Sequence, residues 1–286
     1  MSSQPIRLVL PTGRMHQAVL ALLERAGLSI PRTAKNYRPQ ANDDRFEVKL
    51  MKPANIPTLL DMGSHDIGFS GLDWVRETGS NVETLLDTEI LPVRLVSAAP
   101  VGAVPFERTD RPLVVASEYE RLTREYMTRR GVEWTFLRTY GATEVFPPED
   151  ADMIVDNTAT GSALAANHLE AIDLLLRSTT WFIASPQALR RPEVRRAVDD
   201  LCLLLRGALD ADKRVLLEMN VDGTRLDAVV ELLPAMKAPT VQPLYGNGEY
   251  AVKAAVPRDR VAQLIPQLRA AGASDILETD ITRVIS

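Results

Sequence analysis

Short apolar runs and longer amphipathic segments alternate along the first third of the chain. The runs predict buried strands, and apolar residues spaced at i, i+3 and i+4 between them predict helices that bury one face. We expect strands at 6–10, 46–50 and 65–69, and helices at 15–26, 56–62 and from Gly71 onward. Such alternation is typical of an α/β layer with parallel pairing, so this part is predicted to form one lobe.

A proline-containing connecting segment at 100–112 separates this lobe from a second α/β region. Ser117 and Glu120 have the spacing of a capping box, which predicts that a helix begins there. Apolar residues aligned from Ala165 to Leu176 predict a helix over about 162–176. Strands are expected at 90–98, 113–116, 132–137, 152–155 and 179–184, the last of which returns to the first lobe.

The C-terminal region has the order βαββαβ, which is typical of a ferredoxin-like domain. A helix with apolar positions from Val194 to Leu205 leads into it, and the turn 245–248 joins its two middle strands. We expect strands at 214–219, 240–244, 250–256 and 275–285, and helices at 226–233 and 261–268. The predicted domains are residues 1–93 with 178–208, residues 94–177, and residues 211–286.

Composition restricts the classes of function. The 286 residues are 45% hydrophobic and 25% charged, with a net charge of −5, and the pI is about 5.4, which argues against a nucleic-acid-binding protein. The single cysteine, Cys202, excludes a disulfide framework and a cysteine zinc site, and its apolar neighbours predict that it fills the core. The three widely separated histidines argue against a built-in metal site.

No stretch of the sequence reaches the roughly 18–20 apolar residues that span a bilayer. The N-terminal residues lack a hydrophobic signal core. We therefore expect a soluble cytoplasmic protein without a membrane partner.

The segment 151–164 carries the strongest candidate chemistry. A strand leads into a hydroxyl-rich loop with Gly161 and then into a helix start, whose N–H groups favour a phosphate. Asp156 opens the loop, where its carboxylate suits sugar hydroxyls or Mg²⁺ better than a phosphate. The pattern thus predicts a sugar-phosphate site, although a strand-to-helix turn capped by Ser or Thr has the same pattern.

Several common site motifs are missing from the sequence. It has no GxxxxGK[ST] or GxGxxG, which excludes a P-loop and a Rossmann fingerprint. Residues 68–71 fall short of the GxSxG nucleophile elbow, which argues against a serine hydrolase. Ser70 and Gly71 fit either a turn before a helix or a ligand-binding turn.

Four motifs in order resemble the long form of ATP phosphoribosyltransferase. They are PTGRM at 11–15; IP at 56–57 with GSHDIGFSGLD at 63–73; GATE at 141–144 with AD at 151–152 and DNTATGSAL at 156–164; and APTVQPL at 238–244 with GA at 272–273 and IL at 276–277. The resemblance covers nearly the whole chain, and the third motif is its most specific part.

The resemblance implies that N1 of ATP displaces pyrophosphate from phosphoribosyl pyrophosphate (PRPP) with Mg²⁺, which is the first step of histidine biosynthesis. It implies a two-lobed core like that of periplasmic binding proteins, with the active site between the lobes. It also implies a ferredoxin-like C-terminal domain that binds L-histidine as feedback inhibitor, and assembly into dimers and hexamers. Deletion after about residue 210 is then expected to abolish histidine inhibition.

The resemblance also implies roles for individual residues. It implies contacts to PRPP from Asp156, Asn157, Thr158, Ala159, Thr160, Gly161, Ser162, Ala163 and Leu164, and contacts to ribose hydroxyls or metal from Asp156, Asp152 and Glu144. Gly13, Arg14, Lys52, Asp66, Ser70 and Gly71 are the candidates for ATP or pyrophosphate; Asp73 fits either a nucleotide contact or a helix cap. Mg²⁺ is expected on substrate phosphates, with Asp156 as a candidate protein ligand. Glu218, Thr240 and Ala273 are the candidates for the histidine pocket.

Three residues depart from the family's pattern. Thr12 replaces a lysine, Asn55 an aspartate and Ala163 a threonine, which leaves the ATP contacts open. The alternatives are a non-catalytic ligand sensor, a phosphoribosyltransferase with another acceptor base, and a secreted solute-binding protein. For the C-terminal domain, the alternative is an oligomerisation module without a ligand.

Overall fold

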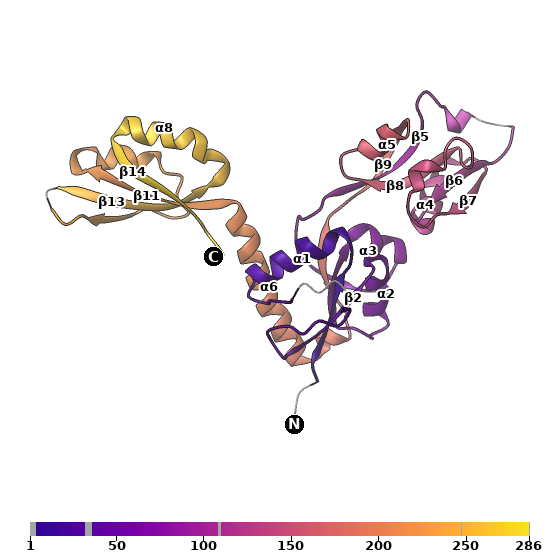
Figure 1. Ribbon diagram of the computed structural model, residues 1–286, viewed down its shortest axis with the longest axis horizontal. Coiled ribbons are helices and arrows are strands. Elements are labelled where there is room, and N and C mark those ends of the chain that lie inside the picture. The colour runs from indigo at the N-terminus through magenta and orange to yellow at the C-terminus, as the bar shows by residue number, and fades with distance from the viewer. Residues whose placement is uncertain (1–3, 32–35, 108–109, 247, 286) are drawn as a thin grey trace. The chain divides into compact units, whose positions relative to one another are not determined.

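The computed structural model describes residues 4–31, 36–107, 110–246 and 248–285 (Figure 1). It divides into two compact units, Met1–Ala21 with Leu28–Val198, and Leu22–Gly27 with Asp199–Ser286. Helices α1 (Arg14–Arg25) and α6 (Pro192–Asp212) each contribute residues to both units. The larger unit contains two five-stranded sheets and the smaller unit one four-stranded sheet.

The first sheet is mixed. Its strands, in spatial order, are β2 (Phe46–Met51), β1 (Ile6–Pro11), β3 (Ile67–Gly71), β10 (Thr180–Ala184) and β4 (Glu83–Asp87). Strand β1 is parallel to β2 and β3, whereas β10 is antiparallel to β3 and β4. The connections contain α1, α2 (Ile56–Asp61) and α3 (Leu72–Thr78). Parallel pairing brings the carboxyl ends of β1, β2 and β3 to one edge, and the predicted return of the 179–184 strand is confirmed.

The second sheet is also mixed, and it surrounds a separate core. Its order is β7 (Trp134–Arg138), β6 (Leu113–Ser117), β8 (Met153–Thr158), β5 (Val93–Pro100) and β9 (Leu169–Ser178), with helices α4 (Glu120–Arg130) and α5 (Ser162–Ala166). Leu95, Val115 and Met153 are fully buried between the sheet and its covering elements. Strand β6 is parallel to β7 and β8, so the loops that follow these strands meet at one edge.

The prediction of a helix over 162–176 is wrong for most of that range. Helix α5 ends at Ala166, His168 has a left-handed φ of 55°, and β9 then pairs antiparallel with β5. Two register shifts leave Ile172 and Leu175 as extra residues in β9, and both pack on the same core cluster. Each bulge interrupts the strict alternation of a strand. The apolar positions therefore mimic a helical period in a strand.

The capping box expected at Ser117 does not form. The Ser117 hydroxyl accepts from the backbone N–H of Tyr119 and donates to the carbonyl of Val155. The first-turn N–H groups of Arg121 and Leu122 donate instead to the Glu77 carboxylate of α3, each at 3.0 Å. A residue 44 positions earlier in the chain thus caps α4, which the local sequence does not reveal.

The C-terminal sheet has the predicted ferredoxin-like topology. Its order is β12 (Thr240–Pro243), β13 (Glu249–Pro257), β11 (Arg214–Asp222) and β14 (Ala273–Asp280), and all neighbours are antiparallel. Helices α7 (Leu226–Leu232) and α8 (Val261–Ala271) share a core with alternate residues of β11, and Figure 1 shows α8 along one face of this sheet. The last strand ends at Asp280 rather than at 285, and Asn247 of the predicted turn lies outside the described residues.

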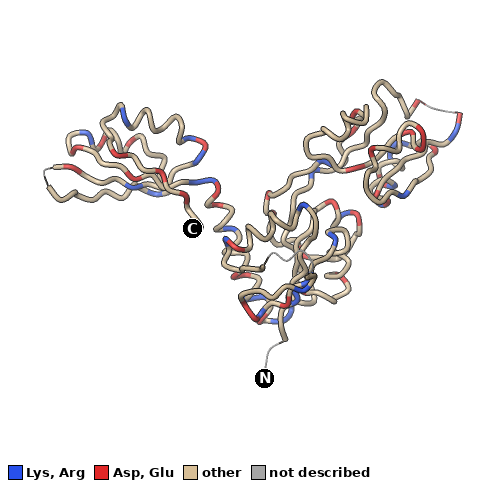
Figure 2. The backbone as a smooth tube through the Cα atoms, viewed as in Figure 1, with Lys and Arg blue, Asp and Glu red and all other residues tan. Residues whose placement is uncertain are grey.

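Three further observations concern charge, the single cysteine and membrane spans. Figure 2 shows basic and acidic residues mixed along the chain rather than gathered in one stripe. Cys202 is half-buried on α6, so it does not fill the core as predicted. Among the described residues, none of the helices combines the length and apolar character needed to cross a membrane.

Candidate active site

A cavity of about 360 Å³ lies at the carboxyl ends of β6 and β8, and we call it the loop pocket. Eight of the nine residues of the predicted PRPP loop line it, all except Gly161. Its lining consists of Arg14, Glu118, Gly141, Ala142, Thr143, Glu144, Asp156, Asn157, Thr158, Ala159, Thr160, Ser162, Ala163 and Leu164. The structure therefore brings the loop together with Arg14 and Glu144, which are distant in sequence.

The hydroxyl groups of the loop hold its backbone in shape. Thr158 Oγ1 accepts from the N–H of Gly161 at 3.0 Å, and Thr160 Oγ1 accepts from the N–H of Ser162 at 3.3 Å. Gly161 has a φ of 86°, which favours glycine, and a Cβ there would meet nothing within 4 Å. The amides of Ala163 and Leu164 lie in the first turn of α5, where a helix leaves N–H groups unpaired. The loop can thus offer amides and hydroxyls to an anion.

Asp156 lies in an acidic part of the loop pocket. Burial, together with the negative charges of Glu144 and Glu118, raises the pKa of Asp156 to about 6, although a 2.7 Å hydrogen bond from the N–H of Asn157 opposes the shift. A carboxylate in this position can accept hydrogen bonds from sugar hydroxyls and attracts a cation.

The same carboxylates fit Mg²⁺, which prefers oxygen ligands and usually keeps substrate phosphates and water in its coordination shell. No cluster of three metal-ligating side chains occurs among the residues that the structure describes. The protein would therefore supply one or two ligands, from Asp156 and Glu144.

A second cavity of about 400 Å³ adjoins the first, and we call it the Trp74 pocket. Its lining consists of Thr12, Gly13, Arg14, Met15, Lys52, Pro53, Asp73, Trp74, Leu91, Pro92, Val93, Asn157 and Ala159. Three of these residues, Arg14, Asn157 and Ala159, also line the loop pocket. The pocket combines apolar walls with the cations Arg14 and Lys52, which suits a nucleotide base that carries phosphates.

Asp66 and Asp152 lie outside both pockets, contrary to expectation. Asp66 precedes β3 and pairs with Arg7 and Arg191, each at 2.8 Å. Burial opposes ionisation of Asp66, but the hydrogen bonds and charge of Arg7, aided by Arg191, hold its pKa below the usual value. Asp152 precedes β8 and forms a bidentate pair with Arg111. Both aspartates stand at the amino ends of strands whose carboxyl ends face the pockets, so we leave them out of the site.

Ser70, Gly71 and Asp73 are bound to other protein groups. The buried Ser70 hydroxyl donates to the carbonyl of Pro53, and a Cβ on Gly71 would come within 2.1 Å of Asp73 Oδ1. The Asp73 carboxylate caps no helix; instead it accepts from the hydroxyls of Tyr119 and Ser178. Ser70 and Gly71 therefore shape the site without lining either pocket.

Sequence reasoning missed Glu118, Thr143 and Tyr119 as parts of the site. Glu118 and Thr143 line the loop pocket, and Tyr119 is fully buried beside it with its hydroxyl bound to Asn157. Glu118 lies inside the capping-box spacing predicted from Ser117 and Glu120. Its place at the carboxyl end of β6, parallel to β8, is the signal that indicates proximity to Asp156.

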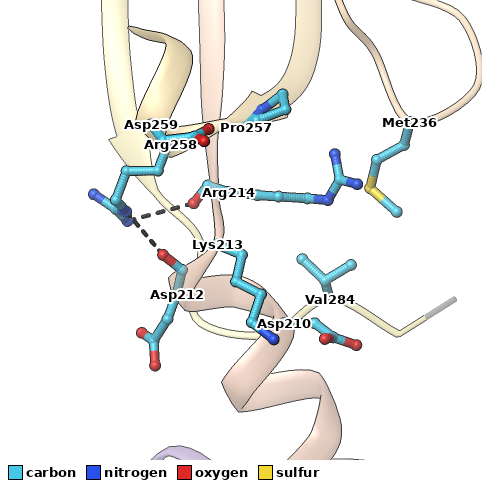
Figure 3. A pocket seen from close by; sticks show the side chains of 9 residues that line it. All are labelled: Asp210, Asp212, Lys213, Arg214, Met236, Pro257, Arg258, Asp259 and Val284. Atoms are coloured by element: carbon cyan, nitrogen blue, oxygen red, sulfur yellow. Dashed lines mark hydrogen bonds between the residues drawn. The ribbon is translucent and has the colours of Figure 1, made fainter. Parts of the chain in front are cut away.

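The three predicted histidine contacts do not gather in one place. Glu218 pairs with Lys253, which lies opposite Thr240 in the sheet, whereas Ala273 is buried opposite Val221 in the core below α7 and α8. A cavity of about 720 Å³ in this unit has none of the three in its lining (Figure 3). In it, Arg258 donates to the carbonyls of Asp212 and Arg214 at 3.0 and 3.3 Å.

Comparison with known proteins identifies the family of the chain. The family described as HisG, ATP phosphoribosyltransferase, matches residues 52–207, and the HisG C-terminal domain matches residues 211–283. The chain belongs to the ATP phosphoribosyltransferase family. It is 38% identical to the ATP phosphoribosyltransferases of Pelotomaculum thermopropionicum and Desulforudis audaxviator, over 98% of its own length and 99% of theirs.

A solved structure of the same family is similar to most of this chain. A chain of the ATP phosphoribosyl transferase (HisG:HisZ) complex from Thermotoga maritima is 25% identical, with a TM-score of 0.62. It covers 70% of this chain, and this chain covers 98% of it.

The family assignment confirms the resemblance found in the sequence. The chain is an ATP phosphoribosyltransferase of the long form, an enzyme of the first step of histidine biosynthesis. The predicted fold class, two α/β lobes followed by a ferredoxin-like domain, is also confirmed.

Proposed function

We propose that PRPP occupies the loop pocket and ATP the Trp74 pocket, and that the transfer takes place where the two meet. The observation that carries this assignment is the shared lining of Arg14, Asn157 and Ala159. Two separate substrates that react directly need adjoining sites with a common boundary.

The loop pocket suits PRPP at both ends of the sugar. The 5-phosphate would accept from the hydroxyls of Thr160 and Ser162 and from the amides that open α5. Asp156 would accept from a ribose hydroxyl, because its carboxylate lies beyond the loop amides in an acidic part of the pocket. Phosphate and ribose are thereby fixed, which leaves C1 to face the boundary with the Trp74 pocket.

Positive charge at the boundary would stabilise the reaction. Breaking the bond from C1 to pyrophosphate develops negative charge on the leaving group and an oxocarbenium-like sugar, so orientation and charge neutralisation carry the catalysis. Arg14 is placed to pair with the leaving pyrophosphate, and Lys52 with the phosphates of ATP. Mg²⁺, held by substrate phosphates and by Asp156 or Glu144, would supply further charge neutralisation.

The decisive experiment measures the ATP- and PRPP-dependent rise in near-ultraviolet absorbance with Mg²⁺ and pyrophosphatase. We expect a rise with the natural chain, a loss of at least about tenfold in kcat with R14M, and partial recovery with R14K, because lysine keeps the charge but loses the bidentate geometry. Replacement of Arg76 on α3, which lies outside both linings, is the matched control. An R14M enzyme as active as the R76M control would overturn this placement of the leaving group.

We further propose that the C-terminal unit responds to L-histidine and supports self-assembly into dimers and hexamers. Glu218 and Thr240 are the candidate contacts, because both lie opposite Lys253 on the sheet face away from the core. Inhibition is measured with E218Q and T240A, which should need about tenfold more histidine at unchanged substrate KM. Full sensitivity in both variants would place the inhibitor elsewhere in the chain.

A further inference from the structure

A buried group of polar side chains joins the Trp74 pocket to the loop pocket. Its members are Asp73, Ser178, Tyr119 and Asn157, from α3, β9, the start of α4 and β8. Tyr119 is fully buried, and Asp73 and Ser178 are 3% and 2% exposed. The Tyr119 ring also stacks on Trp74, with ring centroids 4.5 Å apart. The group therefore reaches both pockets through Asn157, whereas Tyr119 and Ser178 line neither of them.

The hydrogen bonds in this group have a fixed direction. Ser178 Oγ accepts from the N–H of Asp73 at 3.0 Å and donates to Asp73 Oδ1 at 2.6 Å. Tyr119 donates its single hydroxyl hydrogen to Asp73 Oδ2 at 2.6 Å. The Tyr119 oxygen is then left as an acceptor, and Asn157 Nδ2 donates to it at 2.9 Å.

This direction determines which way the Asn157 amide faces. An asparagine side chain has one donor end and one acceptor end, and the two differ only by a flip. Because Tyr119 has no hydrogen left to give, it can bind only the NH₂ end. The carbonyl oxygen Oδ1 is then turned away from Tyr119, and Asn157 is half-buried in the lining of both pockets.

We propose that Asp73 and Tyr119 are positioning residues that hold the Asn157 carbonyl oxygen as a hydrogen-bond acceptor at the boundary of the two pockets, where it takes a donor group of a substrate. The inference rests on the proposed function. At this boundary the available donors are a ribose hydroxyl of PRPP and the exocyclic amino group of adenine. Tyr119 touches neither substrate and acts through Asn157.

The test is a double-mutant cycle with Y119F, N157L and the double variant, with KM measured separately for PRPP and for ATP. Y119F removes the hydroxyl that selects the amide orientation, and N157L removes the amide at similar volume. We expect both single variants to raise the same KM by about tenfold, the value of one hydrogen bond to a substrate. The double variant should match N157L, because a residue that acts only through Asn157 adds nothing once the amide is gone.

Tyr126 provides the matched control. Like the Tyr119 hydroxyl, its hydroxyl donates to a carboxylate, that of Asp173. Its second partner is Ser97 instead of an asparagine, and Tyr126 lies outside both linings. Y126F should lower thermal stability much as Y119F does, with both KM values unchanged. A rise in the KM for PRPP identifies the ribose as the donor, and a rise in the KM for ATP identifies adenine.

Three outcomes would overturn the inference. The first is that Y119F has the same two KM values as Y126F. The second is that the KM increase of the double variant equals the product of the increases in Y119F and N157L. A natural chain that forms no product from ATP and PRPP would overturn the proposed function and this inference with it. The wild-type rate is measured first, so the two failures are distinguished.

Discussion

Asp156 is a largely buried carboxyl group in an acidic part of the loop pocket. Its pKa is raised to about 6, so folding favours its protonated form. Ionisation therefore opposes folding, and stability falls as the pH rises from about 4 through 6. A shift of this size corresponds to as much as ~3 kcal/mol at neutral pH. The carboxylate is retained at a cost in stability, which is typical of a functional group.

We predict that D156N raises the free energy of unfolding by about 1–2 kcal/mol at pH 8, because the substitution removes the buried charge. The difference should shrink toward zero near pH 4, where the natural carboxyl is already protonated. Urea unfolding of both proteins at the two pH values checks this. Turnover of D156N should fall by about 100-fold or more, since the amide is a weaker acceptor for the ribose. A D156N enzyme of natural activity would contradict the assigned ribose contact.

The acidic neighbours of Asp156 give a second prediction at the residue scale. The kcat/KM for PRPP should fall about tenfold for each pH unit below about 6, because the protonated carboxyl is a much weaker acceptor for the ribose and has lost its negative charge. Removing a negative neighbour lowers the pKa of an acid, so E144Q should move this transition to lower pH. If the transition came from titration of PRPP itself, its midpoint would be the same in the natural chain and in E144Q. An identical midpoint in both enzymes would therefore show that ionisation of Asp156 does not cause the transition.

At the scale of elements, α4 depends on another helix for its start. Glu77 of α3 accepts from two first-turn N–H groups of α4, and burial raises the pKa of this carboxyl. The contact joins α3, which is connected to the first sheet, to α4, which packs on the second sheet. Such a cap contributes as much as a local one, provided that the tertiary structure holds both helices in place.

We predict that E77A lowers the free energy of unfolding by about 1–2 kcal/mol, because two amides lose their acceptor. The matched control is E125A, which removes only an exposed i, i+4 ion pair with Arg121 and should cost less than about 0.5 kcal/mol. Chemical denaturation of both variants checks the difference. Equal losses would show that the Glu77 contact does not cap α4 in solution.

Strand β9 shows why an element can be misread from its sequence. Its apolar residues are spaced like those of a helix because two bulges place Ile172 and Leu175 on the core side. The free edge of β5 selects the strand, and the residues of that edge lie 69 to 85 positions earlier in the chain, from the Pro100–Leu169 pair to the Val93–Ser178 pair. Local periodicity contains no information about such a partner.

At the scale of the whole molecule, the C-terminal sheet has one face covered by α7 and α8 and one face with exposed apolar groups. On the second face, Leu277 lies opposite Glu218 and is 60% exposed. Leu216 and Ala255 lie beside each other on the same face and are half-buried. Apolar groups on an uncovered sheet face suit contact with another copy of the chain.

We therefore predict that L277D shifts the chain to smaller assemblies, because a charge on this face opposes its burial. Sedimentation velocity with and without L-histidine measures the change. L174D is the control, since Leu174 is a similarly exposed leucine on a strand of the larger unit. An unchanged sedimentation coefficient for L277D would exclude this face from the assembly.

The two-unit organisation also changes how the histidine response should be tested. Deletion after residue 210 would remove Asp212 and Arg283, which bind Arg25 at the end of α1. The first residue of that helix, Arg14, lines both pockets. Loss of activity on truncation would then have two causes, so single substitutions in the C-terminal unit are the better test.

The sequence by itself determined most of the strands, the ferredoxin-like order of the last domain and the loop that begins at Asp156. These features depend on residues close together in the chain, such as Gly161 and the hydroxyls that shape the turn. The sequence also identified the family, because the order of its motifs is recognisable without a structure.

Only the tertiary structure decided which polar groups reach the pockets. Asp66 and Asp152 stand at the wrong ends of their strands, where arginines far away in the sequence neutralise them. Tyr119 and Glu118 reach the site because parallel pairing of β6 and β8 brings their carboxyl ends together. The direction of a strand and the identity of its neighbours are set by long-range pairing, and a linear pattern does not encode them.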